Sequence, residues 1–259
     1  MITVKWNKTV DPLGKTTQEF RLLRKSKRDV TGALWLPHSK IKDTLIVFGH
    51  GASGNRYQAP ICSLANRFIK NGYASISIDG PVHGLREIPP GGREAFAQEL
   101  RSPTVIEDMI EDWDIAIKLS ADKTKLANKT FAYFGLSMGS IFGIPLLASF
   151  ARDSNQVVVA TLGLLGTTGA VKFLGNRFKT DASLITSPTL FLMQLEDELF
   201  PRDGCLELFD SIGSSNKTLH ANPGLHPEVP TIEIDYAFQF MLGHIEGHLT
   251  NPKNTPIAQ

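Results

Sequence analysis

Gly135-Leu136-Ser137-Met138-Gly139 is the stretch of this 259-residue chain that decides its fold. It has the pattern G-x-S-x-G, and apolar runs lie directly before it, at 130–134, and after it, at 141–150. A strand that enters a sharp turn and leaves as a helix is the setting in which this pattern marks a nucleophilic serine. The turn strains the serine backbone and needs flanking residues without bulk, which glycine provides. Since a simple Gly/Ser turn would look the same, the interpretation depends on finding chemical partners for Ser137.

Beyond residue 40, apolar strands alternate with helical patterns. Residues 44–48 form a near-continuous apolar run, which is typical of a central parallel strand buried on both faces. Similar patterns predict strands at 74–78, 130–134, 157–162, 189–195 and 217–221, and helices at 60–70, 105–119 and 231–248. This alternation predicts an α/β fold with a mostly parallel, doubly wound sheet of about eight strands. Pro145 is expected to kink or shorten the helix that follows the serine turn.

The first forty residues differ from the rest, because turn signals rather than helices separate their β-type segments. Segments 3–10, 18–23 and 32–37 therefore predict an N-terminal antiparallel β region. The chain has no repeat, linker or break in composition. We therefore expect residues 1–259 to form a single domain, with a loose polar tail over 250–259.

The composition gives evidence on which partners the protein binds and on where in the cell it lies. With 20% charged residues and a net charge of +1, the chain gives little support to a nucleic-acid partner. No stretch approaches the roughly 18 apolar residues that span a membrane, and the N-terminus lacks the layout of a signal peptide. Two isolated cysteines, Cys62 and Cys205, fit a reducing compartment. These observations predict a cytoplasmic protein and leave its oligomeric state open.

Asp197 is the expected acid partner of the serine. A serine hydroxyl needs a base to take its proton, and the base needs an acid to orient it. In an open α/β sheet such groups come from loops at the carboxyl ends of strands. Asp197 follows the strand predicted at 189–195, while its neighbours Glu196 and Glu198 are rivals and Asp203 lies further on.

His226 is the expected base. Of seven histidines, it is the one in the loop after the final predicted strand and before the final helix. His220 falls within that strand, and His244 and His248 lie near the end of the last helix, where a cation complements the helix dipole. An exposed loop histidine without a role is the alternative interpretation.

Donors for a developing oxyanion are expected in the loop after the strand at 44–48. This loop, Gly49-His50-Gly51-Ala52-Ser53-Gly54, is rich in small residues that let N–H groups turn inward. The expected donors are the N–H groups of Ala52 and of Met138, the residue after the serine. For His50 a structural role is favoured over a catalytic one.

Two further residues with metal-binding side chains, Asp79 and His83, follow the strand at 74–78. Together with His50 they are residues of the types that bind metals. Their spacing matches no metal-binding pattern such as H-E-x-x-H, so neither a metal nor another cofactor is expected.

Together these residues resemble the α/β-hydrolase superfamily over nearly the whole chain. The resemblance rests on the His50-Gly51 loop, Asn71-Gly72-Tyr73, the D-x-P-x-H-G pattern at 79–84, the serine turn, Asp197 and His226. The N-terminal β region, which ends in Gly32-Ala33-Leu34-Trp35-Leu36-Pro37, is similar to the dienelactone-hydrolase-like and prolyl-oligopeptidase-like serine esterase branches. The resemblance implies a catalytic triad of Ser137, Asp197 and His226, with an oxyanion hole formed by the N–H groups of Ala52 and Met138.

The expected cleft is open and apolar. Segments 85–104 and 167–187 are candidate flaps, but neither is large enough for a deep lid, so the lid is expected to be small or absent. Apolar residues that would wall the cleft, or serve as ordinary core, are Leu136, Phe173, Leu199 and Phe200. An open cleft favours short-chain or aryl carboxylic esters and would also admit polymeric ones.

The predicted function is therefore that of a serine carboxylesterase, which acts on a small-molecule or polymeric ester through an acyl-enzyme. A small peptidase or amidase with the same three residues is one alternative, and a non-catalytic small-molecule receptor is another. Other chemistry of the fold, such as thioester, carbon–carbon or haloperoxidase-type reactions, also stays open, because a fold alone does not define a function.

Overall fold

The computed structural model describes residues 3–127, 130–153 and 156–248. The predicted tail, 250–259, lies outside the described residues. The strands are β1 (Thr3–Val10), β2 (Thr16–Leu23), β3 (Val30–Trp35), β4 (Thr44–Gly49), β5 (Ser75–Ile78), β6 (Thr130–Gly135), β7 (Val157–Gly163), β8 (Thr189–Gln194) and β9 (Lys217–Asn222). The helices are α1 (Ala59–Lys70), α2 (Gly92–Glu99), α3 (Val105–Thr124), α4 (Met138–Asp153), α5 (Gly175–Ala182), α6 (Arg202–Ser211) and α7 (Thr231–Ile245), with short 3₁₀ helices η1 (Gly84–Arg86) and η2 (Gly169–Leu174).

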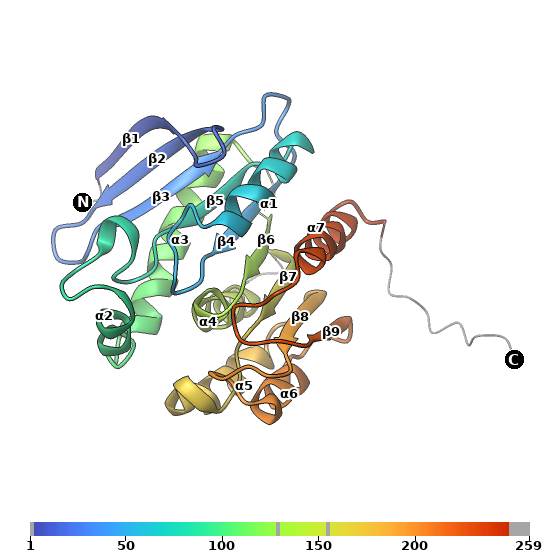
Figure 1. The fold of residues 1–259 in the computed structure, drawn as a ribbon. Helices are drawn as coiled ribbons and strands as arrows, with labels where there is room; N and C mark the ends of the chain where they lie inside the picture. Colours follow the sequence, from blue (N-terminus) through green and yellow to red (C-terminus); the bar gives the residue numbers. More distant parts are fainter. Residues whose placement is uncertain (1–2, 128–129, 154–155, 249–259) are drawn as a thin grey trace, which may run out of the picture.

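The described strands form one nine-stranded sheet in the order β1-β2-β3-β5-β4-β6-β7-β8-β9 (Figure 1). Strand β1 pairs with β2, β2 with β3, and β3 with β5, and these three pairs are antiparallel. All the other pairs, from β5–β4 across the sheet to β8–β9, are parallel. This arrangement confirms the predicted α/β sheet with an antiparallel N-terminal region.

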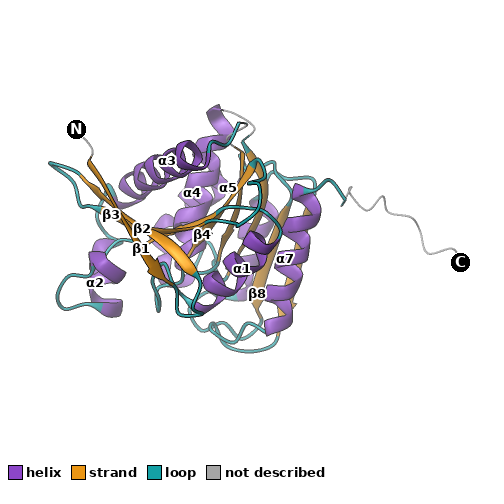
Figure 2. Cartoon of the chain, turned by 90° about the horizontal axis from the view of Figure 1, so that it is seen from above, coloured by secondary structure: helices purple, strands orange, loops and turns teal. Residues whose placement is uncertain are grey.

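Helices cover both faces of the sheet (Figure 2). On one face α1 and α7 bury a core with the central strands, in which Phe68 packs 4.9 Å from Phe238 between ring centroids. On the other face α3, α4, α5 and α6 bury a second core, which includes Trp113 and Phe178. Strands β4 and β8 are buried along their whole length, which explains their continuous apolar sequences.

The helix that follows the serine turn differs from its prediction. The expectation that Pro145 shortens this helix was wrong, because α4 continues through Pro145 to Asp153. Proline inside a helix removes one hydrogen bond and costs about 3 kcal/mol. Residues 138–148 are all buried between the sheet and neighbouring helices, and this packing offsets the cost.

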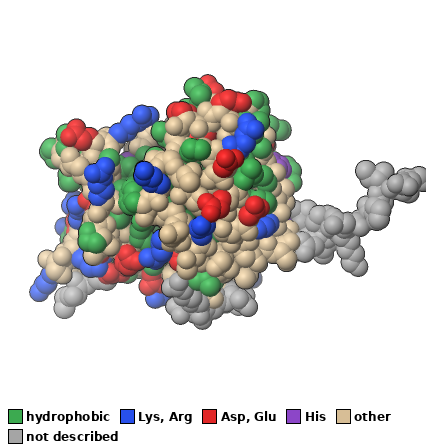
Figure 3. Space-filling model, turned by 90° about the horizontal axis from the view of Figure 1, so that it is seen from below, with side chains coloured by type: hydrophobic (Ala, Val, Ile, Leu, Met, Phe, Trp, Pro, Cys, Tyr) green, Lys and Arg blue, Asp and Glu red, His purple; other side chains and the backbone are tan. Residues whose placement is uncertain are grey.

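The surface shows no strong charge asymmetry on the face drawn in Figure 3, where Lys and Arg side chains alternate with Asp and Glu. Among the described helices none combines the length and the apolar character that a bilayer crossing requires.

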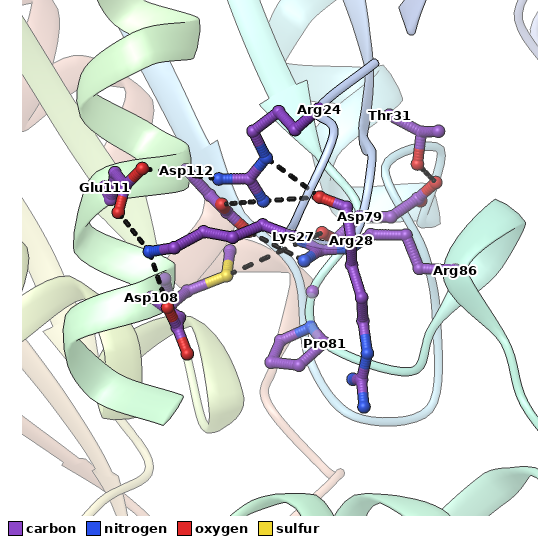
Figure 4. A network of polar contacts seen from close by, with 12 residues as sticks. Arg24, Lys27, Arg28, Thr31, Asp79, Pro81, Arg86, Asp108, Glu111 and Asp112 are labelled. Atoms are coloured by element: carbon purple, nitrogen blue, oxygen red, sulfur yellow. Dashed lines mark hydrogen bonds and ion pairs between the residues drawn. The ribbon is translucent and has the colours of Figure 1, made fainter. Parts of the chain in front are cut away.

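A buried ion network ties the N-terminal strands to the rest of the fold (Figure 4). Asp112 of α3 lies between two guanidinium groups, with Oδ1 2.6 Å from Nη2 of Arg24 and Oδ2 2.7 Å from Nη2 of Arg86. Arg86 also donates to the main-chain oxygen of Asp79 at 2.9 Å. Burial raises the pKa of Asp112, although both arginines act against this effect. The network therefore holds the loop after β5 against α3 and the end of β2.

Asp112→Asn is expected to destabilise the protein by about 3 kcal/mol, because it leaves Arg24 and Arg86 buried without the carboxylate between them. Urea denaturation at pH 7 measures this loss. The matched control is Asp114→Asn on the same helix, where Asp114 forms a more exposed pair with Lys118 and the cost should be at most about 0.5 kcal/mol. Equal losses in the two variants would contradict the role of the network.

Candidate active site

Ser137 lies in the turn between β6 and α4 with a φ of 56°, a left-handed conformation that residues other than glycine rarely adopt. Its N–H donates to the carbonyl of Gly163 at 3.0 Å. Ser140 supports the turn from inside, because its Oγ lies 2.7 Å from the carbonyl oxygen of Gly135 and accepts the N–H of Gly163 at 2.8 Å. Hydrogen bonds to the ends of β6 and β7 therefore stabilise the strained backbone of Ser137.

The glycines that flank the serine are required by close packing. A Cβ on Gly139 would lie 2.5 Å from the carbonyl oxygen of Gly49, at the end of β4. A Cβ on Gly135 would lie 2.9 Å from the carbonyl carbon of Gly139. The first turn of α4 can approach β4 only because these side chains are absent.

Ser137, His226 and Asp197 are brought together in one hydrogen-bonded line. Ser137 Oγ lies 2.8 Å from His226 Nε2, and His226 Nδ1 lies 2.8 Å from Asp197 Oδ2. The three residues come from the loops after β6, β9 and β8, which end at the same edge of the parallel sheet. Side-chain exposure is 12% for His226 and 1% for Asp197, so the line is largely shielded from water.

The environment of Asp197 favours its ionised form. Burial alone would raise its pKa, but hydrogen bonds from His226 and from the N–H groups of Phe200 and Leu199 outweigh burial and hold the pKa below its usual value. Both N–H groups donate to Oδ1 at 2.9 Å, which leaves Oδ2 for the imidazole. An ionised Oδ2 requires the proton on Nδ1, so Nε2 is free to accept the proton of the Ser137 hydroxyl.

Histidines 50 and 83 hold the loop that carries Ala52. His50 is buried, its Nδ1 lies 2.8 Å from the carbonyl of Gly51, and its Nε2 accepts the N–H of Gly80 at 2.8 Å. His83 Nε2 lies 3.0 Å from the carbonyl of Ala52. Burial lowers the pKa of His50 to about 4, so it is neutral at pH 7. These contacts give His50 the structural role that its sequence context favoured.

The N–H groups of Ala52 and Met138 are unoccupied by protein partners. Among the described residues, neither of these two groups donates a hydrogen bond to another protein atom. Met138 is the first residue of α4, and the first N–H groups of a helix have no partner within it. Neither group therefore has an acceptor among the described residues.

The four predicted wall residues fall in different surroundings. The buried Phe200 packs against His226, with ring centroids 5.5 Å apart. Leu136 and Leu199 are partly buried and pack against the two cores. Phe173 is 56% exposed on η2, a segment joined to the Asp197 loop by the N–H of Ala170, which donates to Leu199 at 3.0 Å.

Four polar residues support the histidine loop, and their role was not predicted from sequence. Glu196 and Glu198, which were rivals of Asp197, accept main-chain N–H groups of Gly224 and His226 instead of the imidazole proton. Gln194 and Glu228 also bond to this loop. For Glu196 and Glu198 the available sequence signal was the run of three acids, 196–198, directly after the strand.

Comparisons with known proteins show what the fold of this chain resembles. No family model and no curated protein sequence matches the chain. The PEG-bound complex of a cold-adapted esterase from an Arctic intertidal metagenomic library is 30% identical, with a TM-score of 0.76, over 92% of this chain and 99% of that one. Acetyl xylan esterase from Paenibacillus sp. R4 is 16% identical over 94% of this chain and 89% of that one, with a TM-score of 0.70.

The monoacylglycerol lipase of Paleococcus ferrophilus is 14% identical over 84% of this chain and 100% of that one, with a TM-score of 0.59. At 14% and 16% identity the lipase and the acetyl xylan esterase show the shared fold alone. The cold-adapted esterase is matched in sequence as well as in fold along nearly the whole of both chains, which supports an esterase-type hydrolase. The chain belongs to the α/β-hydrolase superfamily.

Proposed function

We propose that the protein is a serine carboxylesterase that acts through an acyl-enzyme. The observation that carries the proposal is the line from Asp197 through His226 to Ser137, with both contacts at 2.8 Å. A serine hydroxyl gains useful nucleophilicity when a neutral imidazole can take its proton and a carboxylate stabilises the imidazolium that results.

The reaction begins when Ser137 Oγ attacks the ester carbonyl and His226 Nε2 takes the hydroxyl proton. The carbonyl oxygen gains negative charge, which the N–H groups of Ala52 and Met138 stabilise. His226 then protonates the leaving alcohol, and the acyl group stays on Ser137. In the second half His226 activates a water molecule, which releases the carboxylic acid and restores the serine. Asp197 remains ionised throughout and orients the imidazole.

Short-chain and aryl esters are the proposed substrates, and polymeric esters are included because the candidate flaps are short. Segment 85–104 contains only α2 and part of η1, and segment 167–187 contains only η2 and α5. Phe200, whose ring lies 5.5 Å from that of His226, supplies an apolar contact beside the base. The 30% identity to a cold-adapted esterase favours esters over amides.

Ser137→Ala is expected to lower kcat on p-nitrophenyl acetate, butyrate and octanoate by roughly 10⁴-fold or more, because no other group can form the acyl-enzyme. Release of p-nitrophenol measures turnover, and the chain-length series gives the size of the acyl pocket. The matched control is Ser149→Ala on the same helix, which should keep wild-type activity.

Three outcomes would contradict the proposal in different ways. Full turnover by Ser137→Ala would mean that another residue is the nucleophile. Hydrolysis of p-nitroanilides but not of esters by the wild type would identify a peptidase or amidase. No turnover of either substrate class would favour a receptor.

Acidification is expected to lower the free energy of unfolding, because only a neutral His50 can accept the N–H of Gly80 beside the loop that carries Ala52. The pKa of His50 is about 4 in the fold and 6.5 ordinarily. As the pH falls below 6.5 the unfolded chain takes up this proton and the folded protein does not, so stability is lost down to pH 4 and the loss then levels off. The contribution over this window is about 3 kcal/mol.

Urea denaturation of the wild type and of His50→Gln at pH 7 and pH 4.5 measures this effect. The variant, which lacks the titrating group, should lose less stability between the two pH values than the wild type. An equal loss in both proteins would assign the acid sensitivity to other groups.

A further inference from the structure

The loop that carries His226 has little regular structure of its own. It connects β9, which is the last strand of the described sheet, to α7. Gly224 has a φ of +117°, and Leu225 is 47% exposed. A general base must nevertheless be held within a fraction of an ångström of the proton that it takes. The accuracy has to come from side chains that bond to the main chain of the loop.

Three successive main-chain N–H groups of this loop each donate to a different carboxylate. Gly224 donates to Glu196 Oε2, Leu225 donates to Glu228 Oε2 at 2.7 Å, and His226 donates to Glu198 Oε2 at 2.9 Å. Hydrogen bonds to a charged acceptor are roughly twice as strong as neutral ones. The loop is therefore fixed residue by residue as far as the histidine itself.

A buried amide fixes the carbonyl groups on both sides of this run. Gln194, the last residue of β8, is 1% exposed, and its Nε2 donates to the carbonyls of Pro223 at 3.3 Å and Glu228 at 2.9 Å. The same end of β8 leads directly into Glu196, Asp197 and Glu198. One segment, 194–198, thus makes most of the contacts that hold the histidine loop.

The run of three acids contacts His226 in two different ways. The middle side chain is buried and bonds to the imidazole, whereas the outer two are exposed and bond to the main chain. Glu198 therefore contacts the same residue as Asp197, but at its main-chain N–H. The N–H of His226 lowers the pKa of Glu198, so this acceptor is ionised at neutral pH.

We infer that Glu198 is a positioning residue for His226, and that its carboxylate holds the main chain of the base while Asp197 holds the ring. This role rests on the proposed esterase function. Glu198 acts through His226 and touches neither the ester nor the serine. Its removal lets the loop shift, and the imidazole then meets the Ser137 hydroxyl in the correct geometry for a smaller fraction of the time.

Steady-state kinetics of Glu198→Ala and Glu198→Gln on p-nitrophenyl acetate test the inference. Glu198→Ala should lower kcat about tenfold while KM stays near the wild-type value, because the base is misplaced but the cleft is intact. Glu198→Gln should recover most of the loss, because its amide oxygen still accepts the N–H of His226. Inactivation by phenylmethylsulfonyl fluoride, which reports the reactivity of Ser137 directly, should slow in the same order.

Asp203→Ala is the matched control, since Asp203 is an exposed acid in the first turn of α6 whose side chain makes no hydrogen bond to another described residue. It removes the same charge and should leave kcat unchanged. Thermal unfolding of each variant should give a midpoint close to that of the wild type, because Glu198 is exposed.

Three results would overturn the role of Glu198: wild-type kcat in Glu198→Ala, a raised KM with unchanged kcat, or equal losses in the alanine and glutamine variants. Ser137→Ala is assayed in parallel, so that an error in the role of Glu198 can be distinguished from an error in the proposed esterase function. Retained turnover in Ser137→Ala would overturn both proposals, whereas lost turnover together with normal Glu198→Ala would overturn this inference alone.

Discussion

The close approach of α4 to the end of β4 is the constraint on which the rest of the site depends. It requires glycine at 49, 135 and 139, and it forces Ser137 into its left-handed conformation. The fully buried Tyr133 stabilises the contact between α4 and β4, because its hydroxyl donates to the carbonyl of Gly139 at 2.6 Å. As a result the N–H of Met138, at the start of α4, lies close to the end of β4, from which the loop that carries Ala52 begins. The serine itself lies in the turn between β6 and α4.

The second half of the site follows from the pairing of β8 with β9. Their register is parallel from Thr189 opposite Lys217 to Gln194 opposite Asn222. Because both strands end at the same level, the acidic run and the histidine loop begin side by side. The N–H of Leu195 continues the pairing with a bond of 2.8 Å to the carbonyl of Asn222. The pairing of β8 with β9 thus brings the loop of His226 next to residues 194–198. Hydrogen bonds from polar side chains then fix the position of the histidine within the site.

Most of the sheet could be predicted from sequence because central strands such as β4 and β8 are buried along their whole length and read as continuous apolar runs. The short helices α2, α5 and α6 could not, since they are polar and lie within long connections where no clear apolar periodicity stands out. The length of the helix through Pro145 was mispredicted because the burial of residues 138–148 outweighs a local propensity. At the site, strand order was enough to select Asp197 and His226 as candidates. The contacts of Glu196, Glu198 and Gln194 depend on loop geometry, which residue types alone do not encode.

Because β9 is the last strand of the described sheet, the assembly of the proposed catalytic residues depends on the pairing of β9 with β8. Ser137 and its turn lie among the central strands β4, β6 and β7, which all precede β8 and β9 in the chain. His226 arrives only when the last strand pairs with β8 and its loop bonds to residues 194–198. Before this pairing forms, no base lies beside the serine hydroxyl to take its proton. The reactivity of the nucleophile is therefore coupled to the pairing of the last strand of the described sheet.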